Sequence, residues 1–117
     1  MASFNKVIVM GNLTRDPELR YTPSGVPACG FGLALNRRSQ NGRGSEVEEV
    51  TFVEITVWGK QAEACAEYRR KGRTVLIDGH LRQDRWETAE GERRSQVKVV
   101  AESVKFLCRL EAEERLA

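Results

Sequence analysis

The chain has 117 residues, which is enough for one compact domain and too few for two. Hydrophobic residues make up 40% of it and charged residues 31%, which excludes wholesale disorder, and no apolar run approaches the ~18–20 residues that a membrane span needs. Nineteen basic residues against seventeen acidic ones give a net charge of +2. The N-terminus has no charged and apolar leader, so we expect a cytoplasmic protein with reduced thiols.

The first expected strand covers residues 5–13. Val7, Ile8, Val9 and Met10 form a continuous apolar run there, which is typical of a strand covered on both faces. Since one barrel can bury only one of these faces, the second face predicts a partner subunit. Turn signals follow at residues 15–18 and 22–25.

Residues 28–35 alternate between bulky and small side chains, which predicts a second strand with one apolar face and one nearly bare face. The polar residues 36–45 are expected to form a mobile loop, and a long strand is expected from about residue 47 to 58. Residues 60–71 have helical spacing and end on the cations Arg69, Arg70 and Lys71 before Gly72, a typical helix stop. Two further strands, over residues 74–86 and 94–106, are joined by a turn at 88–92.

This order of elements predicts the fold class. Three strands, one helix and two strands, with glycines inside the strands, fit a small closed barrel better than a sandwich or a parallel sheet. We therefore expect an all-β protein with one helix: an oligonucleotide-binding (OB) fold, a five-stranded Greek-key barrel with its helix between strands 3 and 4. The domain should span residues 1–107, and residues 108–117 should form a short charged C-terminal tail.

Strand alternation predicts which side chains face the core. The core side is expected to hold Val53, Ile55 and Val57 of the third strand, Val75, Ile77 and Leu81 of the fourth, and Val97, Val99 and Ala101 of the fifth. Phe52, Trp58 and Trp86 then lie on the opposite, polar side of the pleat.

Aromatic rings on the polar side of a strand need a cover, which can be a loop, a subunit contact or a nucleic-acid base. Bases stack on indole and phenyl rings, and each stack contributes ~1–3 kcal/mol. Cations placed between the rings can contact the phosphates; the candidates are Arg82, Arg85, Arg94 and Lys98. Rings and cations on one face favour single-stranded nucleic acid as the cover.

Several specific stretches follow one another along the chain: 5–13 with 16–18 and 20–21, then 58–63, 68–72, and 79–82 leading to Trp86. In these stretches, and from about Asn5 to Phe106 as a whole, the sequence resembles the bacterial-type single-stranded DNA-binding protein (SSB) family. The resemblance implies an OB fold and sequence-tolerant binding of single-stranded DNA during replication, recombination and repair. It also implies a homotetramer, with dimers formed near Val7–Met10, in the cytoplasm and associated with the nucleoid.

Relatives stack bases at positions that match Phe52, Trp58 and Trp86, the residues that alternation singles out. Many carry another stacking ring in the loop between strands 2 and 3, where this chain has Ser39 beside Arg37 and Arg38. One stacking position is therefore expected to be missing, with the arginines offering phosphate contacts instead. The expected DNA-binding residues are Phe52, Trp58, Trp86, Arg37, Arg38, Lys60, Arg82, Arg85, Arg94 and Lys98.

Many relatives also continue into a long linker with an acidic, apolar tip that recruits repair enzymes. This chain ends at Leu116 and Ala117 without such a linker. We therefore expect no recruitment through such a tail, whether the chain is a natural short form or a piece of a longer protein.

Enzymatic chemistry is not expected, because one histidine and three scattered cysteines supply neither a nucleophile–base pair nor a metal cluster. His80 is expected to be a bystander or an auxiliary contact on a strand surface, and Cys29 and Cys65 to pack as small hydrophobes. We expect no catalytic residues, no metal site and no cofactor. Two other classes stay open: an OB-fold replication-restart (primosomal) interaction module, and a structural homo-oligomer whose outer rings seal subunit contacts.

Overall fold

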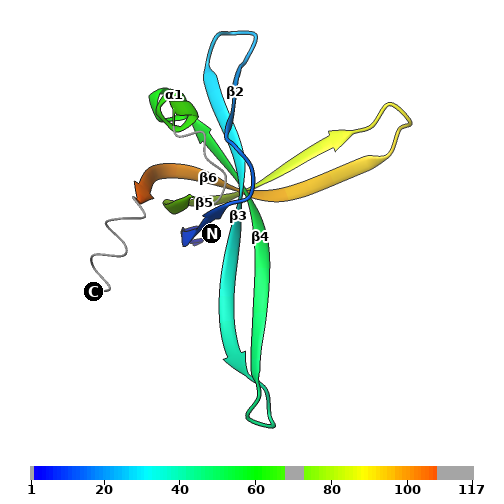
Figure 1. Ribbon diagram of the computed structural model, residues 1–117. Helices are drawn as coiled ribbons and strands as arrows, with labels where there is room; N and C mark the ends of the chain where they lie inside the picture. Colours follow the sequence, from blue (N-terminus) through cyan, green and yellow to red (C-terminus); the bar gives the residue numbers. More distant parts are fainter. Residues whose placement is uncertain (1, 68–72, 108–117) are drawn as a thin grey trace.

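The computed structural model describes residues 2–67 and 73–107 and is mostly β, with one helix (Figure 1). The strands are β1 (Val7–Leu13), β2 (Glu18–Tyr21), β3 (Pro27–Gln40), β4 (Glu46–Trp58), β5 (Thr74–Glu87) and β6 (Arg93–Leu107), and the helix is α1 (Lys60–Glu67). Within the described residues, no helix has the length and apolar character required to cross a membrane. The expected tail, residues 108–117, lies outside the described part of the chain.

Five of the strands close into a barrel. Neighbouring strands pair in the order β1-β5-β6-β4-β3, and a short pairing of β1 with β3, at Asn12–Ala34 and Leu13–Leu33, completes the ring. The pairings are antiparallel except for β4–β6, which is parallel. The fold class expected from the sequence, a five-stranded barrel with its helix between the third and fourth barrel strands, is confirmed. The short strand β2, which pairs with the edge of β3, was not expected.

The barrel core is formed by alternate residues of these strands. Phe31, Leu33, Ile55, Ile77 and Val57 are among its largest fully buried side chains. Helix α1 packs on this core through small residues, which include Ala62 and Cys65.

The two described cysteines are both buried, as expected of small hydrophobes. Burial raises the pKa of the Cys65 thiol to about 12, with a smaller contribution from Cys29. A thiol with so high a pKa stays protonated and unreactive near neutral pH. The cations expected in the last turn of the helix, at 69–71, and the expected stop at Gly72 lie outside the described residues.

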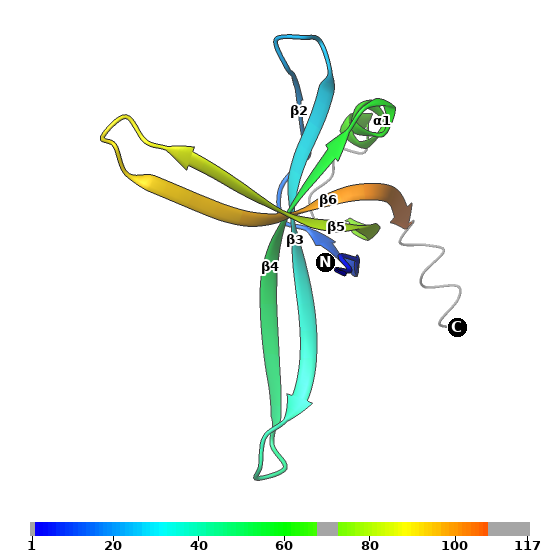
Figure 2. The ribbon, with the colours of Figure 1, turned by 180° about the vertical axis from the view of Figure 1, so that it is seen from behind.

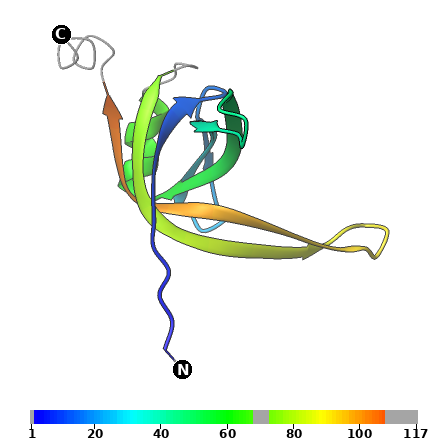
Figure 3. The same ribbon diagram turned by 90° about the horizontal axis from the view of Figure 1, so that it is seen from below.

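Two long hairpins, β3–β4 and β5–β6, project from the barrel in different directions (Figures 1 and 2). Seen from below, the β5–β6 hairpin extends well past the strands that enclose the core (Figure 3). This length explains where two burial predictions were wrong. Leu81 and Val97 lie on the core side of the pleat, as alternation predicts, but both are exposed. Val97 pairs with Gln83 in the projecting part of the hairpin, and Leu81 lies where that part begins, opposite Val99, the buried residue of β6 nearest the hairpin tip.

The loop expected at residues 36–45 is shorter than predicted, because residues 36–40 belong to β3. The β3–β4 register continues without interruption to Gln40 and Glu46, so only five residues form the turn. Opposite charges face each other along this extension, with Arg37 opposite Glu49 and Arg38 opposite Glu48. In the turn, the Asn41 side-chain oxygen accepts hydrogen bonds from the backbone N–H groups of residues 43 and 45, at 2.9 and 3.1 Å. The polar residues of this segment therefore pair as strands, where their composition had suggested a loop.

Close approach of the strands explains two of the glycines. A Cβ atom on Gly79 would lie 2.1 Å from the backbone oxygen of Val100, at the irregularity between Asp78 and Gly79 where β6 shifts register against β5. A Cβ on Gly11 would lie 2.4 Å from the backbone oxygen of Ala34, where β1 meets β3. Both glycines are needed for the barrel to close.

Candidate nucleic-acid interface

One continuous face of the molecule carries the rings singled out by the sequence. Ile55 and Val99 pair across β4 and β6 and are both buried, so the alternate residues Thr56 and Val100 share the side that faces away from the core. The same alternation extends this side into β3 and β5. We call it the outer face. It carries Ala28, Gly30, Gly32, Ala34 and Arg38 of β3, Phe52, Glu54, Thr56 and Trp58 of β4, Arg94, Gln96 and Lys98 of β6, and His80, Arg82, Asp84 and Trp86 of β5.

All three rings on the outer face are accessible. Phe52 is 73% exposed, Trp58 is 37% exposed and Trp86 is 46% exposed. Phe52 lies opposite Ala34 and Trp58 opposite Ala28, so the neighbouring strand leaves room beside each ring. Exposed rings flanked by small residues offer flat apolar surfaces on which bases can stack.

The third ring, Trp86, lies beside a surface pocket. Trp86 lies opposite Arg94 near the end of the β5–β6 hairpin. It lines a surface pocket of about 420 Å³ together with Arg85, Arg93 and Arg94. A flat ring beside several guanidinium groups can hold a base and its phosphate at the same time.

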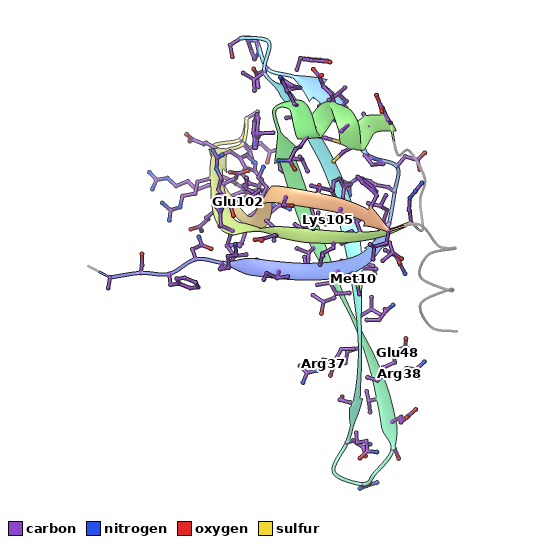
Figure 4. The ribbon with its side chains drawn as sticks, turned by 90° about the vertical axis from the view of Figure 1, so that its left-hand side faces the viewer. Met10, Arg37, Arg38, Glu48, Glu102 and Lys105 are labelled. Atoms are coloured by element: carbon purple, nitrogen blue, oxygen red, sulfur yellow. The ribbon has the colours of Figure 1, made fainter. Side chains whose placement is uncertain are left out.

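The cations expected at the interface fall into two groups. Arg38, Arg82, Arg94 and Lys98 share the outer face with the rings, and exposed Lys60 begins the helix two residues after Trp58. Arg37 and Arg85 occupy the alternate positions of their strands. Arg37 lies on the other side of its hairpin, whereas Arg85 still lines the pocket of Trp86. Figure 4 shows Arg38 beside Glu48 on one side of the β3–β4 hairpin and Arg37 on the other side.

Several of these cations are already paired with acidic side chains. Asp84 lies between two of them, with its carboxylate 2.5 Å from the Lys98 amine and 3.3 Å from Arg82 Nε. Arg94 Nη2 lies 2.9 Å from Glu92. Exposed pairs of this kind are weak and can exchange partners, so the guanidinium groups can turn to a phosphate. Lys98 is the most enclosed of the set, since its side chain is only 19% exposed.

The structure adds two cations that the sequence reading missed. Arg15, which follows β1, forms a two-bonded pair with Glu54 of the outer face. Arg20 of β2 lies opposite Ala28, on the same side of the sheet as Trp58 but with β3 between them, and its Nη2 lies 3.1 Å from Glu18. Hydrogen bonding to Glu54 raises the pKa of Arg15, so it is charged at any pH of interest. Arg20 was missed because β2 itself was not predicted. A strand of four residues between two turn signals shows almost no alternation.

The remaining candidates have simpler surroundings. His80 lies on the strand surface, with Nδ1 3.5 Å from a carboxylate oxygen of Glu102. Among the described residues, no group of three or more His, Cys, Asp or Glu side chains is arranged to hold a metal ion. Neither observation indicates catalysis.

A second exposed apolar surface lies on β1. Ile8 is 66% exposed and Met10 is 57% exposed, and they lie opposite Asp78 and Leu76 of β5. Figure 4 shows β1, β5 and β6 side by side, with Met10 on the first of them and Lys105 on the last. This agrees with the expectation that β1 directs one set of side chains into the barrel and the other set outward.

Comparison with known proteins gives one consistent result. The family model described as the single-strand binding protein family matches residues 4–107. The chain is 47% identical over 107 residues to the single-stranded DNA-binding protein of Treponema pallidum, covering 92% of this chain and 60% of that protein. It is 42% identical over 113 residues to the protein of the same name from Thermotoga maritima, covering 97% of this chain and 80% of that protein. Against the relatives from Treponema, Helicobacter and Wolinella, the chain spans 60 to 64% of their length.

Two solved structures have the same fold. A deletion mutant of the single-stranded DNA-binding protein from Thermus aquaticus superposes with a TM-score of 0.82 at 30% identity, covering 91% of this chain and 51% of that one. The Plasmodium falciparum SSB in complex with single-stranded DNA gives a TM-score of 0.83 at 21% identity, covering 92% and 98%. At that identity the second likeness shows the fold alone.

Proposed function

The chain belongs to the single-strand binding protein family, and from this premise we propose that it binds single-stranded DNA with little preference for sequence. The observation that carries the proposal is the outer face, where three exposed rings and several cations share one side of the barrel sheet. Stacking tolerates any base because every base has a π face, and the cations act on the phosphates, which are the same in every sequence.

In this proposal the rings and the cations have separate roles. Phe52, Trp58 and Trp86 stack bases, while the cations on the same face and at its edge contact phosphates; these are Arg38, Lys60, Arg82, Arg94 and Lys98. Arg37 faces away from the rings, so it would contact a strand that passes around the edge of its hairpin. Arg85 would contact a phosphate at the pocket that it lines with Trp86.

We also propose that the chain assembles into a homotetramer, with dimers formed through β1. Ile8 and Met10 expose an apolar surface that water disfavours, and a second copy of β1 presents the same surface. Placing identical faces against each other is the usual arrangement of a two-fold interface.

The proposed setting is DNA replication, recombination and repair, in the cytoplasm and with the nucleoid. The curated relatives are named for binding single-stranded DNA. Membership of a binding family also agrees with the prediction that the chain is not an enzyme. Residues 1–107 form the proposed binding domain.

Equilibrium titration of a fluorescein-labelled oligo(dT), followed by anisotropy at several NaCl concentrations, tests the proposal. We expect tight binding at low salt and a linear fall of log Kobs with log[salt], with a slope of about −0.7 for each phosphate neutralised. An unlabelled duplex of the same length should compete poorly, because its bases are already stacked. Absence of binding at low salt would contradict the proposal. It would favour the alternative in which the exposed rings form subunit contacts of a purely structural oligomer.

A further inference from the structure

A carboxylate lies in the middle of the outer face, where a polyanion would pass. Glu54 is two residues from Phe52 and four residues from Trp58 on the same side of β4. The two rings are separated by six residues, or about 20 Å of strand. A DNA strand stacked on both rings must therefore carry phosphates past Glu54.

This carboxylate is held by a guanidinium group from a distant part of the chain. Arg15 Nη1 donates to Glu54 Oε2 at 3.2 Å, and Nη2 donates to Oε1. Two parallel bonds of this kind fix the position of an arginine side chain in a way that a single contact does not. The pair uses one N–H from each of two nitrogens, and the Arg15 side chain is still 44% exposed. The guanidinium group therefore has N–H donors left for a further acceptor.

A glycine makes room for the pair. Gly32 lies directly opposite Glu54 in the β3–β4 register. A Cβ atom at this position would lie 3.0 Å from Arg15 Nη1 and 2.5 Å from Thr14 Oγ1. The guanidinium group thus lies over the bare backbone of β3, on the outer face and next to Glu54.

We infer that Arg15 is a phosphate-binding residue of the interface and that Glu54 is the residue that positions it. The inference deepens the proposed function and rests on it. Held by Glu54, the guanidinium group offers its other N–H groups to a phosphate that passes between Phe52 and Trp58. At the same time it neutralises the carboxylate that would otherwise repel that phosphate. Loss of Arg15 therefore has two costs, a lost contact and an unmasked negative charge.

The test is a double-mutant cycle measured by oligo(dT) anisotropy at several salt concentrations. In the native background, Arg15→Ala is expected to weaken binding by about tenfold or more and to reduce the salt slope by about 0.7. In a Glu54→Gln background the same change is expected to cost much less, about threefold, since no carboxylate is unmasked. Equal costs in the two backgrounds would overturn the pairing, and an unchanged Kd and slope in Arg15→Ala would overturn the inference as a whole.

Two further variants separate placement from charge. Gly32→Ala changes no charge but displaces Arg15, so it should weaken binding. Arg15→Lys keeps the charge but cannot form the two-bonded pair, so it should lose affinity while the salt slope is retained. Native-like affinity in both variants, with folding checked by circular dichroism, would contradict a role for the placed guanidinium group.

Lys105→Ala is the matched control, since it removes one positive charge from β6 near Leu76, far along the strand from Arg94. Its salt slope should equal that of the native chain; a slope reduced as much as in Arg15→Ala would mean that net charge alone is being measured. Failure of the native chain to bind oligo(dT) would overturn the proposed function and this inference with it. Native binding that is insensitive to the Arg15 changes would overturn this inference only.

Discussion

Replacing Trp86 by alanine is expected to weaken oligo(dT) binding by about 5-fold to 150-fold, which corresponds to the ~1–3 kcal/mol of one base stack. The ring is 46% exposed and lines the pocket beside Arg94, so its loss removes a stacking surface and leaves the core intact. Isothermal titration or anisotropy at one fixed salt concentration measures the affinity. The salt slope should hardly change, because no phosphate contact is removed.

Tyr21 provides a matched control for this change. Its ring is 60% exposed, but it lies opposite Pro27 on the alternate side of the pleat, away from the outer face. Tyr21→Ala should therefore bind oligo(dT) within about twofold of the native chain. Trp86→Phe should retain most of the affinity, since a phenyl ring still stacks. If Trp86→Ala unfolds the protein while each folded molecule binds normally, Trp86 belongs to the core or to a subunit contact.

Replacing Ile8 and Met10 together by lysine is expected to break the β1 contact and so to lower the mass of the assembly well below four times the 13.2 kDa of one chain. Each copy contributes Ile8 and Met10, so four apolar side chains at the two-fold interface become four facing lysines, which lose burial and repel each other. Because both side chains are directed away from the barrel, the fold of each monomer should be preserved. Light scattering at micromolar concentration measures the mass of the substituted protein. The native chain, measured beside it, should have about four times the monomer mass.

Val47→Lys is the control for that experiment. Val47 is another exposed apolar residue of a strand, but it lies near the tip of the β3–β4 hairpin. The Val47→Lys substitution should leave the mass of the assembly unchanged. A doubly substituted chain that keeps the native mass would show that β1 is not the subunit contact.

Local alternation was sufficient to place the rings. Phe52 and Trp58 are separated by six residues of one uninterrupted strand, so counting by twos puts both on the same side. Trp86 was placed in the same way from Ile77, because the register shift near Gly79 falls in the pairing with β6 and leaves the alternation of β5 intact. The order of the elements likewise predicted the barrel and its helix.

Burial and long-range pairs could not be predicted in this way. Leu81 and Val97 have the side predicted for them, but alternation does not reveal where the barrel ends along a strand. The pair of Arg15 and Glu54 joins residues 39 positions apart, and it depends on where the turn after β1 lies over β3. Composition was also misleading for the β3–β4 extension, where cross-strand pairing decides the structure of a polar segment.

The most direct measurement of the central claim is the intrinsic fluorescence of the two tryptophans during titration with oligo(dT). Both lie on the outer face, so stacked bases should quench both. The account predicts strong quenching that saturates with binding, a part of which remains in Trp86→Phe from Trp58 alone, and little quenching by duplex DNA. Tight binding seen by anisotropy with unchanged tryptophan fluorescence would contradict it, because the DNA would then lie on another surface.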